Sequence, residues 1–270
     1  MLNRNFCTGT FCTRISPGCR NCYASVINKR FGTGAEYTVP NLADHEFYID
    51  EKILAEPLKR KKPATIFFGD MYDGWHESIP EALIDRVMAV VALSPWHVYQ
   101  GLTKRAQRMY DYFSNPATPY RIQQQVDSGL ANAMWPIPNL WLGVSVEDQP
   151  RADQRIELLQ RTPAAIRFLS VEPQLEEIWI ENHLMGQTSC GHPTWVICGG
   201  ESGPGARPFN LAWAESLLDQ CRAAGVPFFM KQIGSNPVAH EWRFSQGVRD
   251  RKGGDLTEWP AHLRVREFPA

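Results

Sequence analysis

The sequence predicts an α/β fold, a partial (β/α) barrel similar to a TIM barrel, with about six parallel strands. Short runs rich in β-branched and aromatic residues alternate with longer amphipathic stretches of helical period. Those runs are apolar at nearly every position, as expected for strands that are covered on both faces. With 270 residues, the chain is long enough for one such domain, so we expect residues 1–270 to form a single barrel domain.

The candidate strands are the six runs that best fit a buried strand. They are residues 65–69, 97–102, 140–146, 166–171, 195–198 and 227–231.

Capping signals mark the helices between these runs. The stretch 78–81 reads S-I-P-E, a capping box with proline in the first turn. Asn210 is the expected N-cap of another helix, which Gly225 ends. We also expect helices over 23–30 and 151–160. The apolar face of the helix after Pro80 is formed by Leu83, Ile84, Val87, Met88 and Val91.

Three stretches interrupt the alternation. Residues 114–139, rich in Pro, Gln and Asn, are expected to form a surface insertion, and 181–193 a loop. From residue 234 to 270 the sequence predicts an irregular C-terminal extension that folds over one end of the sheet. The cysteine segment, residues 7–24, should stand at the start of the barrel.

The composition indicates the cellular compartment of the protein and limits the classes of partner it can bind. The formal charge of −1 and the pI near 6.7 give no global attraction to nucleic acid or an anionic membrane, although a local basic groove stays open. The N-terminus lacks the apolar core of a signal peptide, and no apolar run approaches the roughly 18 residues of a membrane span. We therefore expect a cytoplasmic protein. Seven cysteines in that reducing compartment favour metal binding or thiols over disulfides.

The most informative residues are Cys12, Cys19 and Cys22, in a polar segment rich in turn-forming residues. Thiolates are soft ligands for iron–sulfur clusters or zinc. Three ligands would leave one coordination position open for chemistry. Including Cys7 gives C-x4-C-x6-C-x2-C, a possible four-ligand structural zinc site. By contrast, Cys221 lies on the apolar face of a predicted helix and is expected in the core.

Charged residues follow all six predicted strands, and ligands of parallel α/β folds bind at the carboxyl ends of the strands. Sequence also turns polar at strand ends for simpler reasons. The residues concerned are Asp70 with Asp73, His76 and Glu77, Lys104 with Arg105, Glu147, Glu172, Glu201, and Lys231. We expect Asp70, Lys104, Glu147, Glu172 and Lys231 to line a substrate pocket.

The loop at 199–208 reads G-G-E-S-G-P-G-A-R-P. Its glycines would allow a ligand to approach the backbone closely, Glu201 could accept hydrogen bonds from an amine or ribose, and Arg207 could pair with a carboxylate or phosphate. The G-K-[ST] ending of a P-loop is absent, and the chain has no G-x-S-x-G or H-E-x-x-H motif.

Six segments together resemble a phage and bacterial family of three-Cys-motif, radical-SAM-like proteins. In order, they are S-P-G-C-R-N-C-Y-A at 16–24, L-T-K-R at 102–105, W-L-G-V-S-V-E at 141–147, S-V-E-P at 170–173, the glycine-rich loop at 199–208, and P-F-F-M-K-Q at 227–232.

The resemblance implies that Cys12, Cys19 and Cys22 ligate a [4Fe–4S] cluster. S-adenosylmethionine (SAM) would chelate the fourth iron, and an electron donor would supply the electron that cleaves it to a 5′-deoxyadenosyl radical. Gly199, Gly200 and Glu201 resemble the G-G-E stretch that contacts the methionyl amine, and Arg207 joins them as a cofactor contact. The chain departs from the usual C-x3-C-x2-C spacing, having C-x6-C-x2-C, and its G-G-E follows a late strand.

Three functional interpretations remain. The first is a radical-SAM-type enzyme acting on an unknown substrate; the phage association suggests a nucleobase in DNA or RNA. The second is a zinc-stabilised nucleic-acid-binding or accessory protein without catalysis, with phosphate contacts from the basic residues at 59–62, 104–105 and 249–252. The third is a hydrolytic barrel holding a divalent metal on Asp70, Glu147, Glu172 and Glu201, which leaves the cysteine spacing unexplained.

Overall fold

The computed structural model describes residues 1–4, 7–8, 12–42, 47–125, 134–186, 191–239 and 248–269. The chain divides into two compact units. The first comprises Met1–Ile15, Cys22–Gly143 and Arg161–Ile166, and the second comprises Ser16–Asn21, Val144–Gln160 and Arg167–Ala270.

Seven parallel strands form one sheet that curls into a half-barrel, in the order β1-β4-β5-β6-β7-β8-β10. The predicted partial α/β barrel is therefore confirmed. Its strands are β1 (Leu2–Arg4), β4 (Thr65–Phe68), β5 (Val98–Thr103), β6 (Leu140–Ser145), β7 (Ile166–Val171), β8 (Trp195–Gly199) and β10 (Phe228–Gln232). The strand that the sequence did not predict is β1, whose three residues are too few to show a pattern.

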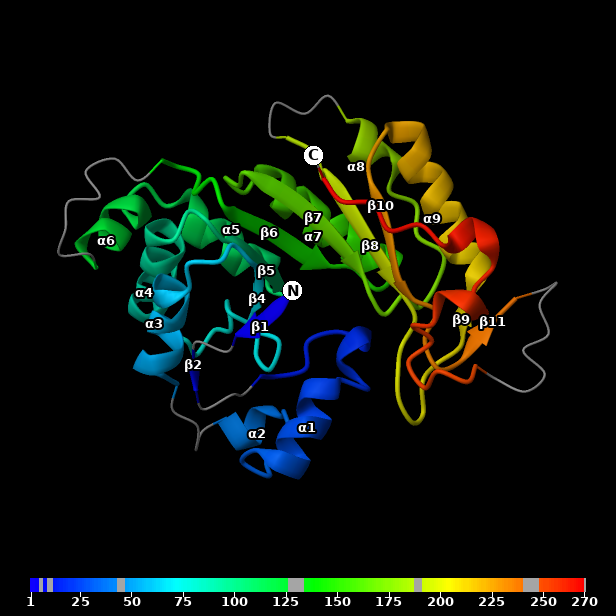
Figure 1. Ribbon diagram of the computed structural model, residues 1–270, viewed down its shortest axis with the longest axis horizontal. Helices are drawn as coiled ribbons and strands as arrows, with labels where there is room; N and C mark the ends of the chain where they lie inside the picture. The colour runs from blue at the N-terminus through cyan, green and yellow to red at the C-terminus, as the bar shows by residue number, and fades with distance from the viewer. Residues whose placement is uncertain are drawn as a thin grey trace. The chain divides into compact units, whose positions relative to one another are not determined.

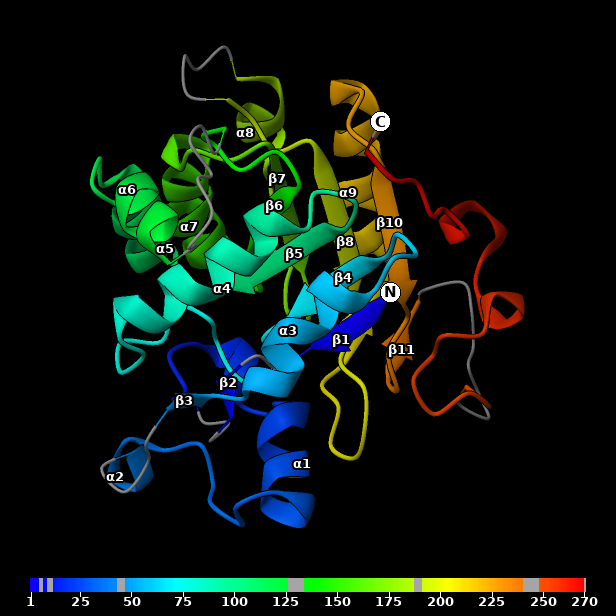
Figure 2. The same cartoon turned by 60° about the vertical axis from the view of Figure 1, so that its left-hand side comes forward.

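In the first unit, β1 pairs with β4, and β4 with β5. Figure 2 shows these three strands side by side. The flanking helices are α3 (Glu51–Lys59), α4 (Glu81–Leu93) and α5 (Ala106–Ser114). Four of the five apolar residues predicted on the face of α4 are buried, with Leu83 half-buried. The capping box expected at 78–81 is wrong: Pro80 occupies the N-cap position without a side-chain bond. The Ser78 amide instead donates to Nδ1 of His76.

The first unit also contains four short elements near its N-terminal segment. Strand β2 (Cys7–Thr8) pairs antiparallel with β3 (Tyr48–Ile49). Helix α1 (Tyr23–Phe31) confirms the helix expected over 23–30, and α2 (Val39–Leu42) follows it.

In the second unit, β8 lies between β7 and β10, and α9 (Leu211–Ala224) packs on β8 and β10 (Figure 1). The predicted cap of α9 is confirmed, because the Asn210 side chain accepts from the Ala212 amide, and Gly225 ends the helix at φ 67°. Helix α7 (Gln149–Arg161) covers the range expected at 151–160. Cys221 is fully buried on α9, as predicted.

Two of the stretches expected to be irregular contain helices. Helix α6 (Thr118–Gln124) lies in the expected insertion and buries Thr118 and Ile122. Helix α8 (Glu181–Met185) lies in the expected loop and buries Leu184. Both helices are short, so their sequences show little helical period. Residues 126–133 and 187–190 of these stretches lie outside the described residues.

The C-terminal extension packs along the edge strand β10. The Met230 amide donates to the Val265 carbonyl, and Phe229 pairs antiparallel with Arg266. This contact satisfies backbone groups that an edge strand would otherwise expose. Strand β11 (Pro237–Val238) pairs with β9 (Phe209–Asn210), and two 3₁₀ turns, Leu256–Glu258 and Ala261–Leu263, surround the buried Trp259.

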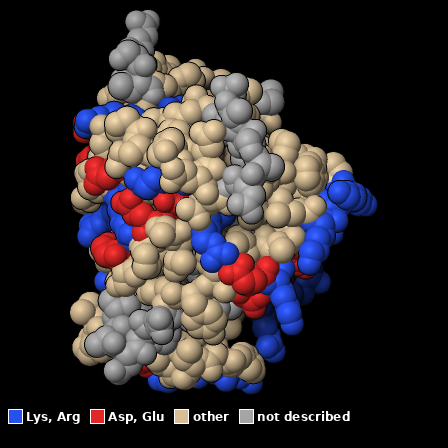
Figure 3. Space-filling view, turned by 90° about the vertical axis from the view of Figure 1, so that its left-hand side faces the viewer, with Lys and Arg blue, Asp and Glu red and all other residues tan. Residues whose placement is uncertain are grey.

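In the part of the chain that the structure describes, no helix is both long and apolar enough to cross a membrane. On the face in Figure 3, several acidic side chains stand beside basic ones, and other residues cover most of the area.

Candidate functional site

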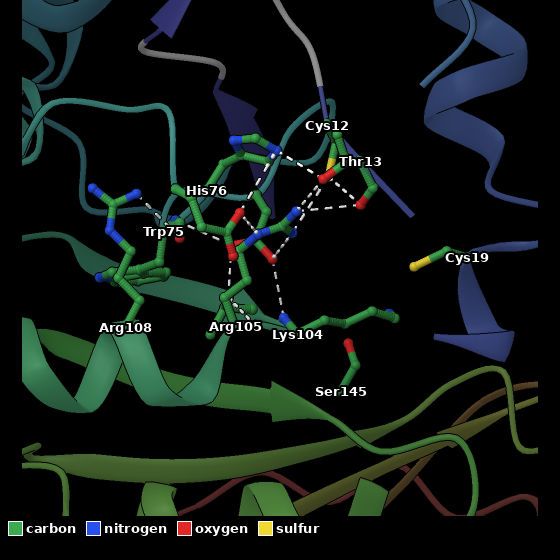
Figure 4. Close-up of polar contacts among 12 residues, drawn as sticks. Cys12, Thr13, Cys19, Trp75, His76, Lys104, Arg105, Arg108 and Ser145 are labelled. Carbon is green, nitrogen blue, oxygen red and sulfur yellow. Dashed lines mark hydrogen bonds and ion pairs between the residues drawn. The ribbon is translucent and has the colours of Figure 1, made fainter. Parts of the chain in front are cut away.

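Arg105, two residues after the end of β5, is the centre of a buried polar network in the first unit (Figure 4). Its side chain is 3% exposed. Nε donates to Glu77 Oε2 (2.7 Å), and Nη1 donates to Asp73 Oδ2 (3.2 Å) and to the Cys12 sulfur (3.6 Å). Nη2 donates to Oγ1 (2.8 Å) and the carbonyl (3.2 Å) of Thr13. All five N–H groups of the guanidinium are therefore used.

Asp73 fixes this arginine to the scaffold. Its Oδ1 accepts from the Thr103 hydroxyl (2.6 Å) and the Trp75 amide (3.0 Å), and Oδ2 also accepts from the Lys104 amide (3.0 Å). Burial lowers the pKa of Arg105, but the neighbouring Asp73, Cys12 and Glu77 outweigh it and raise that pKa above its usual value. The guanidinium therefore stays charged.

His76 joins the network as a neutral ring. Because Nδ1 accepts from the Ser78 amide, its hydrogen is on Nε2, which donates to Thr13 Oγ1 at 3.0 Å. Burial, followed by the charge of Arg105, lowers the pKa of His76 to about 4. The ring is 1% exposed and is held against the residue that follows Cys12.

The other two predicted cluster ligands are half-buried thiols. Cys22 is the N-cap residue of α1, and its carbonyl accepts from the Val26 amide. In the second unit, Cys19 ends a 3₁₀ turn, Pro17–Cys19, and its sulfur lies 3.7 Å from the Ser16 hydroxyl. The side chain of Cys7 lies outside the described residues.

Asp70, in the loop after β4, has one carboxylate oxygen engaged and one not. Oδ2 accepts from the Asn3 side chain (3.0 Å), and the Asp70 carbonyl accepts from the Tyr23 hydroxyl (2.8 Å). Oδ1 is buried without a hydrogen-bond partner. A buried acceptor without a donor lowers the stability of the folded state, and a ligand that supplied a donor would remove this cost.

In the second unit, Glu147 after β6 binds the turn around Cys19. Its side chain is fully buried and pairs with Arg155 Nη1 at 2.9 Å. The Gly18 amide donates to the other oxygen, Oε1, at 3.3 Å. A carboxylate predicted to line a pocket thus accepts a backbone N–H from the cysteine segment.

Glu201 after β8 also binds the segment around Cys19, through Asn21 and through Arg207. Oε1 accepts from Arg207 Nη2 (2.6 Å), while Oε2 accepts from the Asn21 side chain (2.8 Å) and from the amide (2.9 Å) and Nε (3.1 Å) of Arg207. Arg207 Nη1 also donates to the Pro17 carbonyl (2.9 Å). Burial raises the pKa of Glu201, but the hydrogen bonds from Arg207 and Asn21 prevail and lower it.

Protein contacts account for the glycines at the start of this loop. A Cβ on Gly200 would lie 2.7 Å from the Ile233 carbonyl oxygen, and one on Gly199 would lie 3.2 Å from Glu172 Oε1. Gly203 and Gly205 have φ values of 99° and 76°, which favour glycine in turns. Each glycine thus has a structural reason that needs no ligand.

Lys231 and Glu172 form the remaining strand-end pair, with Nζ 2.8 Å from Oε2. This interaction raises the pKa of Lys231. The Lys231 side chain is 55% exposed. In the first unit, Lys104 contributes its backbone amide to the Asp73 network.

The basic runs at 59–62 and 249–252 are largely surface residues. All four residues at 59–62 are exposed. Arg249, whose side chain is 85% exposed, pairs with Glu258 at 3.1 Å.

The structure thus brings the predicted strand-end residues into separate groups within each unit. It places Arg105, Asp73 and Glu77 against Cys12 in the first unit, and Glu147, Glu201 and Arg207 against the 16–21 segment in the second. Thr13, Asn21 and Arg155 carry these contacts as well and were not among the predicted site residues. Thr13 and Asn21 bind partners 92 and 180 residues away in sequence, so no local pattern marks them. Arg155, by contrast, pairs with Glu147 only 8 residues before it.

The donor set fits an iron–sulfur cluster chemically, because thiols are its usual ligands and the Cys12 sulfur already accepts a charged N–H. Among the described residues, no three His, Cys, Asp or Glu side chains are grouped so as to hold a metal ion.

Comparison with known proteins identifies the family alone. No curated protein and no solved structure matches the chain. A family model described as "Protein of unknown function (DUF5131)" matches residues 3–259, nearly the whole chain. The chain therefore belongs to the DUF5131 family, whose function is unknown.

Proposed function

We propose that this protein is a radical-SAM-type iron–sulfur enzyme that generates a 5′-deoxyadenosyl radical to modify its substrate. The observation that carries the proposal is that strand-end residues bind the polypeptide around the cysteines. Arg105 donates to the Cys12 sulfur, and Glu147 and Arg207 bind the backbone of the turn that ends at Cys19. Such a scaffold suits a segment that must hold three sulfurs in a fixed arrangement.

Cys12, Cys19 and Cys22 would ligate three irons of a [4Fe–4S] cluster, with S-adenosylmethionine on the fourth. A bound cluster would supply the one electron that cleaves the sulfonium of S-adenosylmethionine into methionine and the adenosyl radical. The protein's own residues orient the ligands. Arg105, Asp73 and Thr13 fix the chain at Cys12.

The proposed cofactor contacts are Gly199, Gly200, Glu201 and Arg207. Glu201 is already engaged by Arg207 and Asn21, so a bound amine would have to share or displace one of these donors. Asp70 offers an acceptor without a partner, which suits an amine or hydroxyl donor. Lys104, Glu147, Glu172 and Lys231 complete the proposed pocket residues. Of these, Lys231 is the most suited to reach a ligand, since its side chain is 55% exposed.

We further propose that the enzyme works in the cytoplasm with a separate electron donor, and that its substrate is a nucleobase in DNA or RNA. A reducing compartment keeps the seven cysteines as thiols. If the substrate is a nucleic acid, adding DNA or tRNA should raise the rate of SAM cleavage above the rate without substrate. Unchanged rates with both would exclude this substrate class.

The decisive experiment is anaerobic purification followed by reconstitution with iron and sulfide. We expect about four irons and four sulfides per chain, as a [4Fe–4S] cluster requires, and a reduced cluster visible by electron paramagnetic resonance (EPR). With dithionite and S-adenosylmethionine, 5′-deoxyadenosine and methionine should form in equal amounts. Protein that retains zinc alone and cleaves no S-adenosylmethionine would refute the proposal.

Cysteine variants separate the cluster from a structural zinc site. Cys12→Ser, Cys19→Ser and Cys22→Ser should each lose iron and activity. Cys7→Ser is the matched control from the same segment, and it should keep both. An unfolded Cys7→Ser protein would instead indicate a four-ligand zinc site.

A further inference from the structure

We propose that Arg105 is a positioning residue that holds Cys12 as a cluster ligand and raises the reduction potential of the cluster through its hydrogen bond to the ligand sulfur. This inference rests on the proposed function and adds to it a residue that tunes the electron transfer. The bond runs from Nη1 to Sγ over 3.6 Å.

The donor in this bond is anchored independently of the cysteine segment. Arg105 is the N-cap residue of α5, two residues after the end of β5. Asp73 Oδ2 accepts from its Nη1, and Glu77 Oε2 accepts from its Nε. Asp73 is held in turn by the Thr103 hydroxyl and two backbone amides. The guanidinium therefore cannot simply rotate to follow the sulfur, so it defines where the sulfur sits.

Thr13 completes the clamp on the ligand side. Arg105 Nη2 donates to both its hydroxyl and its carbonyl, so one guanidinium binds two consecutive residues of the cysteine segment. The Cys12 sulfur lies 3.6 Å from that same carbonyl, which accepts from the S–H when the thiol is protonated. When the sulfur ligates iron it carries no hydrogen, and the N–H of Arg105 is then its hydrogen-bond donor.

The direction of the effect follows from the charges. A reduced cluster carries one more negative charge than an oxidised one, so a donor or cation at a ligand sulfur stabilises the reduced form. Arg105 also binds Asp73 and Glu77 with the same guanidinium that contacts the Cys12 sulfur. Without its positive charge, the negative charges of these two carboxylates would lose their shared cation near the ligand sulfur and would favour the oxidised cluster.

The test compares reconstituted wild type with Arg105→Gln, Arg105→Lys and Arg108→Gln. Arg108 is the matched control, because it is a second cation on α5 that donates to backbone carbonyls, those of Trp75 and Ile79. Each protein is titrated anaerobically against dithionite, and the reduced cluster is followed by EPR. Iron and sulfide content and circular dichroism are measured alongside.

We expect Arg105→Gln to lower the ratio of reduced to oxidised cluster at a fixed potential about tenfold, which is a shift of about 59 mV for one electron. Arg105→Lys keeps the charge without the planar fork, so it should recover part of the shift. Arg108→Gln should match wild type. An Arg105→Gln protein with a full cluster and the wild-type potential would overturn the inference and leave the proposed function intact.

If the Arg105→Gln protein fails to fold or to take up iron, a second measurement on the wild type tests the inference instead. Wild type labelled with ¹⁵N-arginine should show a nitrogen coupling to the reduced cluster in pulsed EPR, because the N–H donates directly to a ligand sulfur. Absence of that coupling would overturn the inference. A wild type that forms no cluster at all would instead refute the proposed function.

Discussion

Asp73 and Arg105 form an ion pair in which Oδ2 and Nη1 are 3.2 Å apart and the two side chains are 9% and 3% exposed. Buried pairs of this kind gain little over an apolar pair, but removing one partner leaves an uncompensated charge in the interior. Asp73 also accepts three other hydrogen bonds, from Trp75, Thr103 and Lys104. It therefore joins the loop after β4 to the end of β5.

The first prediction is that Asp73→Ala lowers the free energy of unfolding by about 3–5 kcal/mol, the range for breaking a buried pair. The variant removes the buried one of the two carboxylates that pair with Arg105, leaving only the exposed Glu77, and it leaves three other donors without their acceptor. Urea unfolding followed by circular dichroism measures the loss. Asp111→Ala is the control, since Asp111 is exposed on α5 and accepts from Gln107, and it should change stability by less than about 0.5 kcal/mol. Equal stabilities of the two variants would contradict the role given to Asp73.

The second prediction concerns acid stability. The pKa of His76 is lowered to about 4 by burial and by Arg105, whereas an unfolded histidine has a pKa near 6.5. Between these values only the unfolded state binds the proton, so stability is complete above about pH 6.5 and falls as the pH drops toward 4. From pH 7.5 to 5.0 the loss from this residue is about 2 kcal/mol.

His76→Gln removes the titrating group and keeps a side chain that can donate and accept. Urea unfolding at pH 7.5 and 5.0 should show a smaller loss on acidification in this variant than in wild type. The same loss in both proteins would mean that His76 does not titrate differently on unfolding. Glu77 and Asp73, which also face the ring, are present in both proteins and cancel in the comparison.

The parallel sheet was predictable because its strands are long enough to show near-continuous apolar runs. Strand β1 has three residues and gave no such signal. The helix cap at Asn210 was predicted correctly because the interaction is local. The box at 78–81 failed because Pro80 took the cap position and the Ser78 amide found a partner in His76.

In the candidate site too, local features could be predicted from the sequence and long-range contacts could not. The sequence identified the charged strand ends, since these follow each strand directly. It could not reveal that Glu147 and Arg207 bind the backbone at Gly18 and Pro17, because those pairs are 129 and 190 residues apart. Nor could it distinguish glycines that admit a ligand from glycines packed against protein.

The third prediction tests one of those glycines. A Cβ at Gly200 would lie 2.7 Å from the Ile233 carbonyl oxygen and 2.8 Å from Phe209 Cδ1, and the backbone atom has little room to move. We expect Gly200→Ala to lower the free energy of unfolding by about 1–3 kcal/mol, as overpacking does. Gly74→Ala is the control, because its Cβ would meet Phe68 at an ordinary 3.6 Å. If the Gly200→Ala protein is as stable as this control, then the close contact with Ile233 and Phe209 does not require glycine at position 200.

The fourth prediction is that Glu201→Ala loosens the turn around Cys19. The carboxylate accepts from the Asn21 side chain and holds the Arg207 guanidinium, which in turn donates to the Pro17 carbonyl. Removing it takes away the acceptor that fixes both donors, while Glu147 still accepts from the Gly18 amide. Hydrogen exchange measured by mass spectrometry should therefore become faster in peptides covering 16–21 and 201–207. Glu215→Ala is the control, because Glu215 is an exposed residue of α9 whose partner is His262. This variant should leave the exchange rates of both peptides unchanged. If exchange at 16–21 stays at the wild-type rate in Glu201→Ala, then Glu147 alone suffices to hold the turn, and Glu201 is available for a cofactor contact rather than needed for the scaffold.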